Sequence, residues 1–250
     1  GVLNYLNENG LDYFVIGGGS NLLICDNEYD GVVVKIVSKD LPTLIAGDKG
    51  SMISAQAGVS LGALVNLASK EGLAGLEWAI GIPGTVGGAV RGNAGAMGKD
   101  MSCSVYEVQA WQNGEVVKLN AQECKFAYRE SIFKFNRDVI LSVSLFLEPG
   151  NKAEILARAQ NNLKNRAGRM SVYPSAGSFF KNLKLNRWTG DVSDLPELFR
   201  RRGSVPAGWL IEQAGGKGLA AGGAKSSDEH GNLIVNFNKA KQEDVLKLVE

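Results

Sequence analysis

The spacing of apolar positions alternates between helical and strand-like along the chain. Apolar residues three and four positions apart predict helices over 2–9, from 60 to a stop at 72, over 154–166, from 206 to a stop at 215–216, and over 240–250. Alternating or short apolar runs predict strands over 13–16, 32–36, 52–57, 107–112, 115–119, 139–147 and 233–237. This mixture of hairpins and helices indicates an α+β fold rather than a doubly wound parallel sheet.

Residues between and within these elements carry their own local signals. Asn113-Gly114 is typical of a type I′ turn, so the strands on either side should form a hairpin. Asn120 and Glu123 have the spacing of a capping box and predict a short helix. In the helix over 154–166, the residues expected to face inward are Ile155, Leu156, Ala159 and Leu163.

Residues 80–98 break the periodic pattern, and glycine is the reason. The chain has 32 glycines in 250 residues, and they are clustered rather than periodic, which excludes collagen-like and linker sequences. One cluster, Gly17-Gly18-Gly19-Ser20-Asn21, directly follows the predicted strand over 13–16. Clustered glycines in a well-patterned chain suggest main chain that packs closely against something.

Charge and composition exclude several classes of protein. Lys and Arg number 27 and Asp and Glu 26, so we do not expect nucleic-acid binding driven by overall charge. We interpret Arg200–Arg202 as a solvated helix end before Gly203, with a phosphate patch as the alternative. One histidine and three cysteines without a CxxC pair predict no metal site and fit a reduced, cytoplasmic chain. We expect neither a membrane span nor a signal peptide.

The first glycine cluster can form a nest of backbone N–H groups that suits a pyrophosphate, with an ordinary glycine-rich turn as an equal alternative. It does not match the GxGxxG pattern. The second tract, Gly81–Gly98, interleaves apolar residues with glycine and has Pro83 to stiffen it, which is unlike a solvent loop. Main chain this bare can lie flat against a planar ring system, so the two tracts together favour a nucleotide cofactor.

At these tracts the chain resembles the UDP-N-acetylenolpyruvoylglucosamine reductases, whose FAD-binding domain is of the vanillyl-alcohol-oxidase (PCMH) type. Three longer strings strengthen the resemblance, and it covers nearly the whole chain: Tyr128–Lys134, Tyr173–Asn182 and Pro206–Gly218, the last continuing to Asn236. Met97 departs from the family pattern, where an aromatic residue is usual. The resemblance implies FAD and NADPH as cofactors. It assigns FAD binding to Gly17, Gly18, Gly19, Ser20, Asn21, Leu22, Gly81, Ile82, Pro83, Gly84, Thr85, Gly87, Gly88, Ala89, Asn93 and Gly95.

The resemblance also implies a reaction and two catalytic residues. A hydride passes from NADPH through FAD to the β-carbon of the enolpyruvyl ether of a UDP-sugar. Arg129 would neutralise the charge that develops on the substrate, and Ser178 would supply the proton. Taken alone, Arg129 reads as a surface ion pair with Glu130, and Ser178 as a turn hydroxyl; within the matched strings, function is the better interpretation.

Residues expected to bind substrate are Tyr128, Arg166, Arg169, Trp209 and Gln213. Four of them have a structural alternative: Tyr128 and Trp209 as core aromatics, and the two arginines as caps of their own helix rather than ligands of the UDP diphosphate. His230 is interpreted as structural.

The end of the strand at Pro149-Gly150 predicts an FAD-binding domain over 1–149 and a substrate-binding domain over 150–250. By resemblance, an opening strand and a C-terminal glutamate are expected outside this sequence, because Glu250 comes too early. Residues 184–204 look like an insertion, and the family subtype without a substrate-capping loop fits best. A monomer is plausible. The alternatives are another FAD oxidoreductase of the superfamily and an FAD-binding protein without turnover.

Overall fold

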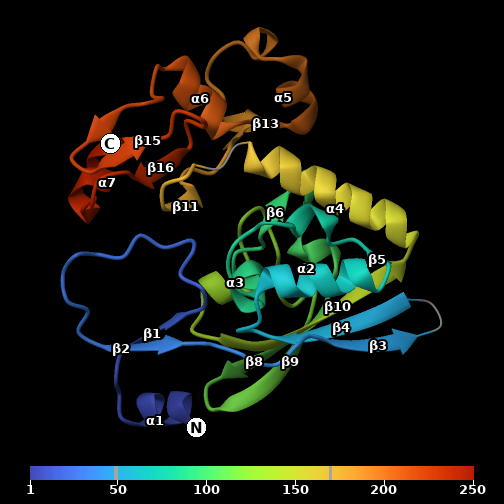
Figure 1. Ribbon diagram of the computed structural model, residues 1–250. Helices are drawn as coiled ribbons and strands as arrows, with labels where there is room; N and C mark the ends of the chain where they lie inside the picture. Colours follow the sequence, from blue (N-terminus) through green and yellow to red (C-terminus); the bar gives the residue numbers. More distant parts are fainter. Residues whose placement is uncertain (48–49, 169–170) are drawn as a thin grey trace. The chain divides into compact units, whose positions relative to one another are not determined.

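The computed structural model describes residues 1–47, 50–168 and 171–250. These residues form two compact units, which are coloured by sequence in Figure 1. The first unit comprises Gly1–Gly19 and Tyr29–Ala167, and the second comprises Ser20–Glu28 and Gly168–Glu250. Both units mix helices with mainly antiparallel strands, as the α+β prediction required.

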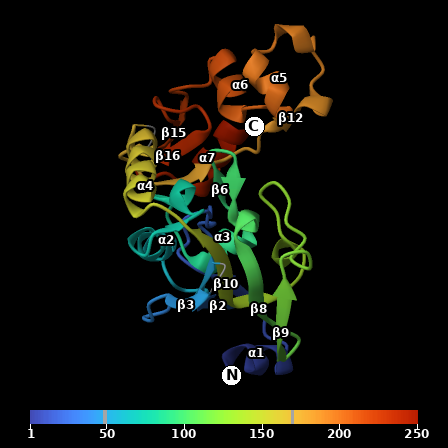
Figure 2. The ribbon, with the colours of Figure 1, turned by 90° about the vertical axis from the view of Figure 1, so that its right-hand side faces the viewer.

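The first unit is built on an antiparallel sheet in the order β3-β4-β10-β8-β9, with β5 paired to the end of β10. These strands are β3 (Thr43–Gly47), β4 (Gly50–Gln56), β5 (Leu73–Ala74), β8 (Val105–Gln112), β9 (Glu115–Asn120) and β10 (Val139–Pro149). The predicted type I′ turn is confirmed, because Asn113 and Gly114 both have positive φ, 48° and 101°. Figure 2 shows the β8–β9 hairpin that this turn closes.

A second, smaller sheet pairs β1 (Tyr13–Ile16) with β2 (Val32–Lys35) in parallel. Helix α1 (Val2–Glu8) precedes it, and Gly10, with φ 62°, ends the helical segment. Trp111 of β8 donates a hydrogen bond to Asn4 at 2.7 Å, which ties α1 to the large sheet. The strand predicted over 13–16 is present as β1, and its Phe14 is 45% exposed because a two-stranded sheet covers only part of the side chain.

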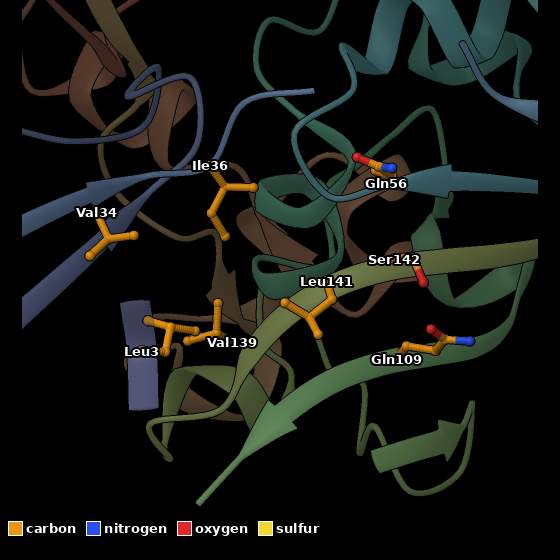
Figure 3. A pocket seen from close by; sticks show the side chains of 8 residues that line it. All are labelled: Leu3, Val34, Ile36, Gln56, Gln109, Val139, Leu141 and Ser142. Carbon is orange, nitrogen blue, oxygen red and sulfur yellow. The ribbon is translucent and has the colours of Figure 1, made fainter. Parts of the chain in front are cut away.

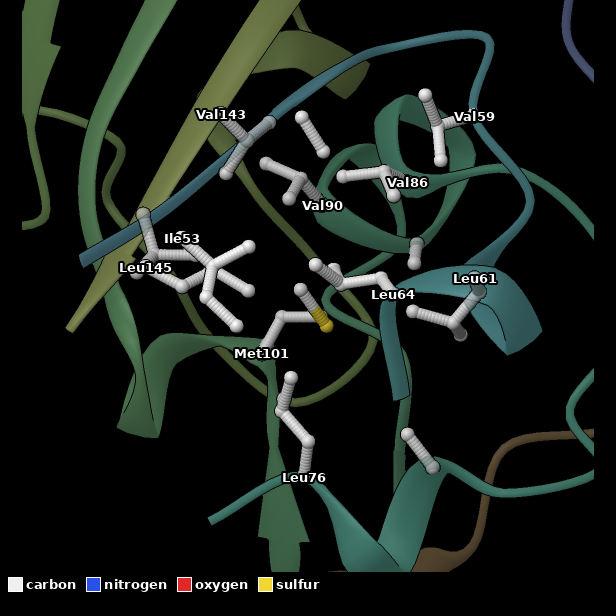
Figure 4. Packing of buried hydrophobic residues seen from close by; sticks show 14 of the residues in the cluster. Ile53, Val59, Leu61, Leu64, Leu76, Val86, Val90, Met101, Val143 and Leu145 are labelled. Atoms are coloured by element: carbon white, nitrogen blue, oxygen red, sulfur yellow. The ribbon is translucent and has the colours of Figure 1, made fainter. Parts of the chain in front are cut away.

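The core of this unit lies between the large sheet and the helices that pack on it, α2 (Leu61–Lys70) and α3 (Val86–Arg91) (Figure 1). Ile53 and Leu145 from the sheet meet Leu64 of α2, and Val86 and Val90 of α3 (Figure 4). Full burial of side chains of this size contributes about 1.5–3 kcal/mol each. Ser60 occupies the N-cap position of α2 as predicted, although its side chain makes no capping hydrogen bond.

Helix α3 was not predicted, since it lies inside the glycine tract that breaks the periodic pattern. Thr85 caps its start by accepting a hydrogen bond from the N–H of Gly88 at 3.3 Å. A Cβ on Gly87 would lie 2.7 Å from the Cβ of Ala57, so only glycine allows this helix to approach β4 so closely. Packing against the sheet therefore outweighs the low helix propensity of Gly87 and Gly88.

Five short elements and one long helix complete the unit. The short elements are η1 (Glu77–Ala79), β6 (Gly95–Ala96), β7 (Lys99–Asp100), η2 (Met101–Cys103) and η3 (Ile132–Lys134), and the helix is α4 (Lys152–Ala167). Two segments of this unit change the sequence interpretation. Asn120 and Glu123 form the reciprocal hydrogen bonds of a capping box, but the residues after them form a turn rather than the predicted helix. In α4, Ile155 and Ala159 are buried as predicted, whereas Leu163 is 45% exposed and lies beside Gly81.

Helix α4 belongs to the first compact unit, although the predicted boundary at 149/150 would assign it to the second domain. Three side chains of α4 explain this, because Arg158, Asn162 and Arg166 all donate hydrogen bonds to residues 77–80. The division at 150 stays a prediction about function. The compact units divide the chain at Ala167 and Gly168 instead.

The second unit contains a four-stranded antiparallel sheet in the order β11-β16-β15-β14. Its elements are β11 (Ser175–Ser178), β12 (Leu183–Lys184), η4 (Leu185–Arg187), η5 (Val192–Asp194), α5 (Glu197–Arg202), β13 (Ser204–Val205), α6 (Ala207–Gln213), β14 (Ala220–Ala221), β15 (Ala224–Ser226), β16 (Leu233–Asn236) and α7 (Gln242–Val249). The expected insertion over 184–204 thus holds α5, whose three C-terminal arginines end at Gly203 with φ 65°, as predicted. Asp26 accepts a hydrogen bond from the N–H of Gln242 at 2.7 Å, which attaches residues 20–28 to α7.

The three cysteines are free thiols, and their environments differ. Cys25 and Cys103 are exposed, whereas Cys124 is fully buried in the core. Burial, and then the nearby charge of Glu123, raise the pKa of the Cys124 thiol to about 11. Among the described residues, no group of three or more His, Cys, Asp and Glu side chains could hold a metal ion. No helix in that part of the chain is long and apolar enough to cross a membrane.

We expect iodoacetamide at pH 8 to alkylate Cys25 and Cys103 in the native protein while Cys124 stays protected. With a pKa of about 11, the thiolate of Cys124 is about 200-fold scarcer at pH 8 than that of an ordinary thiol of pKa about 8.5. Peptide mass spectrometry over a time course measures the three rates. Labelling in urea is the control, where all three should react alike; rapid labelling of native Cys124 would contradict its burial.

Candidate functional site

The two glycine tracts of the first unit pack against each other. A Cβ on Gly17 would collide with the hydroxyl of Thr85, and a Cβ on Gly18 would lie 3.2 Å from the Cα of Gly84. By contrast, a Cβ on Gly19 or Gly98 would meet nothing within 4 Å. The glycines therefore serve two purposes: some let the tracts touch, and others leave open space beside bare main chain.

This arrangement fits a nucleotide cofactor better than a simple turn. Gly19, Gly81, Gly84 and Gly98 all have positive φ, which lets the main chain change direction sharply with no side chain in the way. Main chain without side chains exposes N–H groups to a pyrophosphate and a flat surface to a ring. The residues Gly17–Gly19 and Gly81–Gly95 would hold the FAD in this unit, while Ser20, Asn21 and Leu22 belong to the second compact unit.

Three residues that are not glycine also have positive φ at this site: Asn93 (40°), Met97 (55°) and Arg129 (59°). A left-handed conformation costs a residue with a side chain about 1–2 kcal/mol. Such strain persists only where the surroundings enforce it, and it is concentrated at functional sites. Asn93 is 1% exposed and uses its amide to bind the carbonyl of Ala127 and the N–H of Ser102, so its side chain supports the tract rather than facing a ligand.

Arg129 lies in a tight turn, where Ala127 and Glu130 exchange two backbone hydrogen bonds of 3.0 Å each. Its guanidinium donates to the carbonyl of Gly95 at 2.6 Å and lies 5.2 Å from the centre of the Tyr128 ring. These contacts orient the guanidinium along the second glycine tract, while Tyr128 is 44% exposed. The structure therefore brings Arg129, Tyr128 and the tract together.

Ser178 ends β11 in the second unit, and a β-bulge determines the side of the sheet on which it lies. Ser175 pairs with Val235, and Ser178 pairs with Leu233, so three steps along β11 match two steps along β16. In a regular strand, residues three positions apart point to opposite faces. The extra residue brings Ser178 to the face of Ser175, and Gly177, with φ 81°, allows the bulge.

The same face of this sheet carries a small polar hollow of about 160 Å³. Lys225 pairs with Val235 in the same row as Ser175, and its ammonium binds Asp228 at 2.6 Å. The hollow is lined by Ser171, Tyr173, Lys225, Ser227, Asp228, Glu229, Val235 and Phe237. Ser178 is exposed and is not among the residues that line this hollow.

The predicted substrate residues have mixed surroundings. Arg166 donates hydrogen bonds to the carbonyls of Ile80 (3.0 Å) and Trp78 (3.3 Å), so it caps η1 and not its own helix. Burial lowers the pKa of this guanidinium. Trp209 makes an edge-to-face contact with Phe199 of α5 at 5.3 Å, and Gln213 is exposed. Arg169 lies outside the described residues.

A larger apolar hollow of about 480 Å³ lies elsewhere in the first unit, between α1, β2 and the large sheet (Figure 3). Leu3, Val34 and Ile36 face Val139 and Leu141 across it, and Gln56, Gln109 and Ser142 complete the lining. None of the predicted site residues is among them.

Comparison with known proteins accounts for both halves of the chain. Residues 1–120 match the FAD-binding domain family, and residues 169–250 match the family described as the C-terminal domain of UDP-N-acetylenolpyruvoylglucosamine reductase. A reductase of that name from Carboxydothermus hydrogenoformans is 38% identical over 99% of this chain and 76% of its own length. The chain belongs to the UDP-N-acetylenolpyruvoylglucosamine reductase family.

Two further members of the reductase family support this membership. The reductase from Anoxybacillus flavithermus is 41% identical over 94% of this chain and 72% of its own. The crystal structure of the reductase from Thermus caldophilus superposes with a TM-score of 0.78 and 34% identity, over 99% of this chain and 82% of that one. The resemblance seen in the sequence is confirmed, as is the order of an FAD-binding domain followed by a second domain.

Two structural groups at the site of this family member were not predicted. Glu77 is 8% exposed, and it binds Arg158 through hydrogen bonds of 2.8 and 3.1 Å. Asn232, 3% exposed, holds Phe180 through hydrogen bonds of 2.8 Å to its N–H and its carbonyl, and so fixes the chain after Ser178. A lone acid in the apolar stretch before the second tract was a signal for Glu77; nothing in the sequence marked Asn232 as buried.

His230, excluded from the site by the sequence, is held by the fold. Its Nδ1 accepts a hydrogen bond from the N–H of Asn232 at 3.1 Å. Its ring lies where a Cβ on Gly208 would come within 2.5 Å. Only glycine at 208 therefore lets α6 pack beside the imidazole, in agreement with a structural role.

We expect Glu77→Gln to lower the free energy of unfolding by about 2 kcal/mol at pH 7, because Arg158 and the N–H of Gly75 lose an ionised partner. Burial raises the pKa of Glu77, but hydrogen bonds from Arg158 and Gly75 outweigh it, so the net pKa lies below its ordinary value of 4.5. A lowered pKa stabilises the fold above pH 4.5, and this contribution is lost as the pH falls through the folded-state value.

Urea unfolding of both proteins from pH 7 to pH 3 measures this difference, which should shrink below about pH 4.5. The control is Glu154→Gln, since Glu154 is 69% exposed and only 3.7 Å from the same arginine. This control substitution should lower the free energy of unfolding by less than about 1 kcal/mol. Equal losses in the two variants would contradict the assigned role of Glu77.

Proposed function

We propose that this chain is an NADPH-dependent FAD oxidoreductase that reduces UDP-N-acetylglucosamine enolpyruvate to UDP-N-acetylmuramate, a step of peptidoglycan precursor synthesis. The observation that carries the proposal is the similarity to reductases of this name, 36–41% identical over 94–100% of the chain. The match includes both the glycine tracts and the strings that hold Arg129 and Ser178.

The packed glycine tracts of the first unit fit FAD, with Gly17–Gly19 at the pyrophosphate and Gly81–Gly95 along the ring system. When bound, the flavin supplies the redox chemistry, taking a hydride from NADPH and returning it to the substrate. The part of the protein is to bind, orient and protonate. The contacts of Asn93 and Arg129 with this region would keep the tract rigid during turnover.

Arg129 would bind the carboxylate of the enolpyruvyl group. Hydride addition at the β-carbon places negative charge on the α-carbon and, through it, on the carboxylate. A guanidinium is permanently charged and has donors that match a carboxylate, so it stabilises this charge as it forms. Its bond to Gly95 at 2.6 Å already fixes its direction before substrate binds.

Ser178 would give its hydroxyl proton to the α-carbon, which completes the reduction of the double bond by one hydride and one proton. A serine is a weak acid, but a carbanion is a strong base, so the transfer is favourable once the hydroxyl is in place. The bulge at Gly177 brings this hydroxyl to the face of the sheet that carries Ser175, which supports the proposal. Tyr128, Arg166, Arg169, Trp209 and Gln213 stay proposed as substrate-binding residues.

Two anaerobic half-reactions test the proposal. The purified protein should be yellow, NADPH should bleach it, and UDP-N-acetylglucosamine enolpyruvate should restore the colour and yield a product two hydrogen atoms heavier. If NADPH bleaches it and the sugar nucleotide does nothing, the protein is another oxidoreductase of the superfamily. If NADPH has no effect, it binds flavin without turnover. We place the enzyme in the cytoplasm, which fits its three free cysteines; a monomer stays a prediction.

A further inference from the structure

The turn that carries Arg129 is fastened to the second glycine tract at three points. Asn93 donates to the carbonyl of Ala127 at 3.0 Å, Arg129 donates to Gly95 at 2.6 Å, and Ser131 donates to the carbonyl of Arg91 at 2.7 Å. Ser131 is completely buried. The two segments are 34–40 residues apart in sequence, so these bonds decide where the turn lies in the folded chain.

These three bonds place the turn, but they do not explain why Arg129 adopts a left-handed backbone. Its φ of 59° is strained for a residue with a side chain, and a turn with two central residues accommodates glycine better at this position. Each bond holds the segment before or after Arg129, or its side chain. The two backbone hydrogen bonds between Ala127 and Glu130 close the turn, and a contact on the peptide group of Arg129 itself would stabilise the left-handed conformation within it.

Lys134 makes that contact. It lies at the end of η3, five residues after Arg129, and its ammonium donates to the carbonyl oxygen of Arg129 at 2.8 Å. A hydrogen bond from a charged donor is about twice as strong as a neutral one. Such a bond fixes the direction of the carbonyl, and therefore the backbone angles of Arg129.

We propose that Lys134 is a positioning residue, which holds the Arg129 peptide in its left-handed conformation and so aims the guanidinium at the substrate carboxylate. This inference rests on the proposed function. Without the Lys134 ammonium, the carbonyl of Arg129 would rotate to hydrogen-bond with water, and the backbone would relax to a right-handed conformation. The guanidinium of Arg129 would then lose its hydrogen bond to Gly95 and no longer point at the substrate carboxylate.

The test is Lys134→Met, which keeps the length of the side chain and removes its charge and donor. At saturating substrate, reoxidation of the reduced flavin by the enolpyruvyl sugar nucleotide should slow about 100-fold, the effect of a displacement of about 1 Å. Anaerobic reduction by NADPH should stay within about twofold of wild type. Lys134→Arg, which restores a charged donor, should recover at least a tenth of the lost rate; failure of this rescue would count against the hydrogen bond.

A double-mutant cycle with Arg129→Met separates positioning from mere stability. If Lys134 acts only through Arg129, the double variant is no slower than Arg129→Met alone. Multiplied effects would show that Lys134 acts independently and would overturn the inference. Lys118→Met is the matched control, because Lys118 is 65% exposed and bound only to the surface acid Glu107 in the contacts that the structure shows.

Two results keep the inference apart from the function it rests on. If wild type itself fails to react with the sugar nucleotide, the proposed function is wrong. If wild type reacts and Lys134→Met reacts equally fast, the function stands and the inference is wrong. Should Lys134→Met not fold, Lys134→Gln retains a neutral donor and should give an intermediate reoxidation rate with unchanged reduction; an unchanged reoxidation rate would overturn the inference.

Discussion

Replacing Ser178 by alanine should slow reoxidation of the reduced flavin by UDP-N-acetylglucosamine enolpyruvate about 1000-fold, within the range that a general acid contributes. Reduction by NADPH should stay within about twofold of wild type, because no proton from Ser178 is needed in that half. The variant lacks the hydroxyl that would protonate the α-carbon. Its fold should be unchanged, because the exposed position at the end of β11 tolerates a methyl group. Anaerobic stopped-flow absorbance follows both half-reactions.

The control is Ser193→Ala, another exposed serine of the second unit that lies in η5. It should leave both half-reactions unchanged. If Ser178→Ala slows both halves equally, the hydroxyl is structural and the assignment of the proton donor is wrong. If neither half slows, another group delivers the proton.

The second large effect is expected from Arg129→Met, which should lower the rate of reoxidation 100- to 1000-fold, roughly what the loss of one preorganised donor to a developing anion costs. It should also weaken binding of the substrate, because the carboxylate loses its cation in the ground state as well. Reoxidation rates across a range of sugar-nucleotide concentrations separate the two effects.

Arg137→Met is the control for Arg129→Met, because the Arg137 side chain is 83% exposed and its ion-pair partner, Asp12, lies 3.8 Å away. An ion pair this exposed contributes little, so the control should leave the reoxidation rate unchanged. A drop in binding alone, with an unchanged maximal rate, would mean that Arg129 holds the substrate equally well before and during the reaction. That result would remove it from the catalytic residues and leave it as a binding residue.

The elements with strong local signals were predictable from the sequence. The hairpin closed by Asn113-Gly114 formed because both residues accept positive φ, and α2, α6 and α7 follow apolar spacing with glycine or polar ends. In these elements, the residues that determine the conformation lie within a few positions of one another. Contacts with distant parts of the chain favour the same conformation as the local sequence.

Helix α3 could not be predicted because its stability comes from elsewhere in the chain. Gly87 disfavours a helix locally, yet it alone fits against Ala57, and that partner is 30 positions away. The reverse happened after Asn120, where a correct capping signal led only to a turn because nothing downstream extends it. Leu163 has helical spacing but lies against Gly81 at the surface, outside the main core.

Some features of the candidate site could be predicted from the sequence, and others could not. The glycine tracts and the strings around Arg129 and Ser178 were visible because each is continuous in sequence. The hydrogen bond from Lys134, the caps from Arg166 to η1 and the pair of Glu77 with Arg158 depend on how separate segments meet. Spacing alone contains no information on such contacts, so the hydrogen bonds of Arg166 to the carbonyls of Ile80 and Trp78 could not be predicted.

The bulge in β11 lets Ser178 lie three residues after Ser175 on the same side of the sheet, opposite Leu233. Deleting Ala176 or Gly177 would remove the extra residue, and β11 and β16 would then pair evenly with Ser178 still on that side. The hydroxyl would lose only the local bend and twist that a bulge adds to its strand. A one-residue gap at this point in an alignment would therefore not by itself mean that the serine has changed sides.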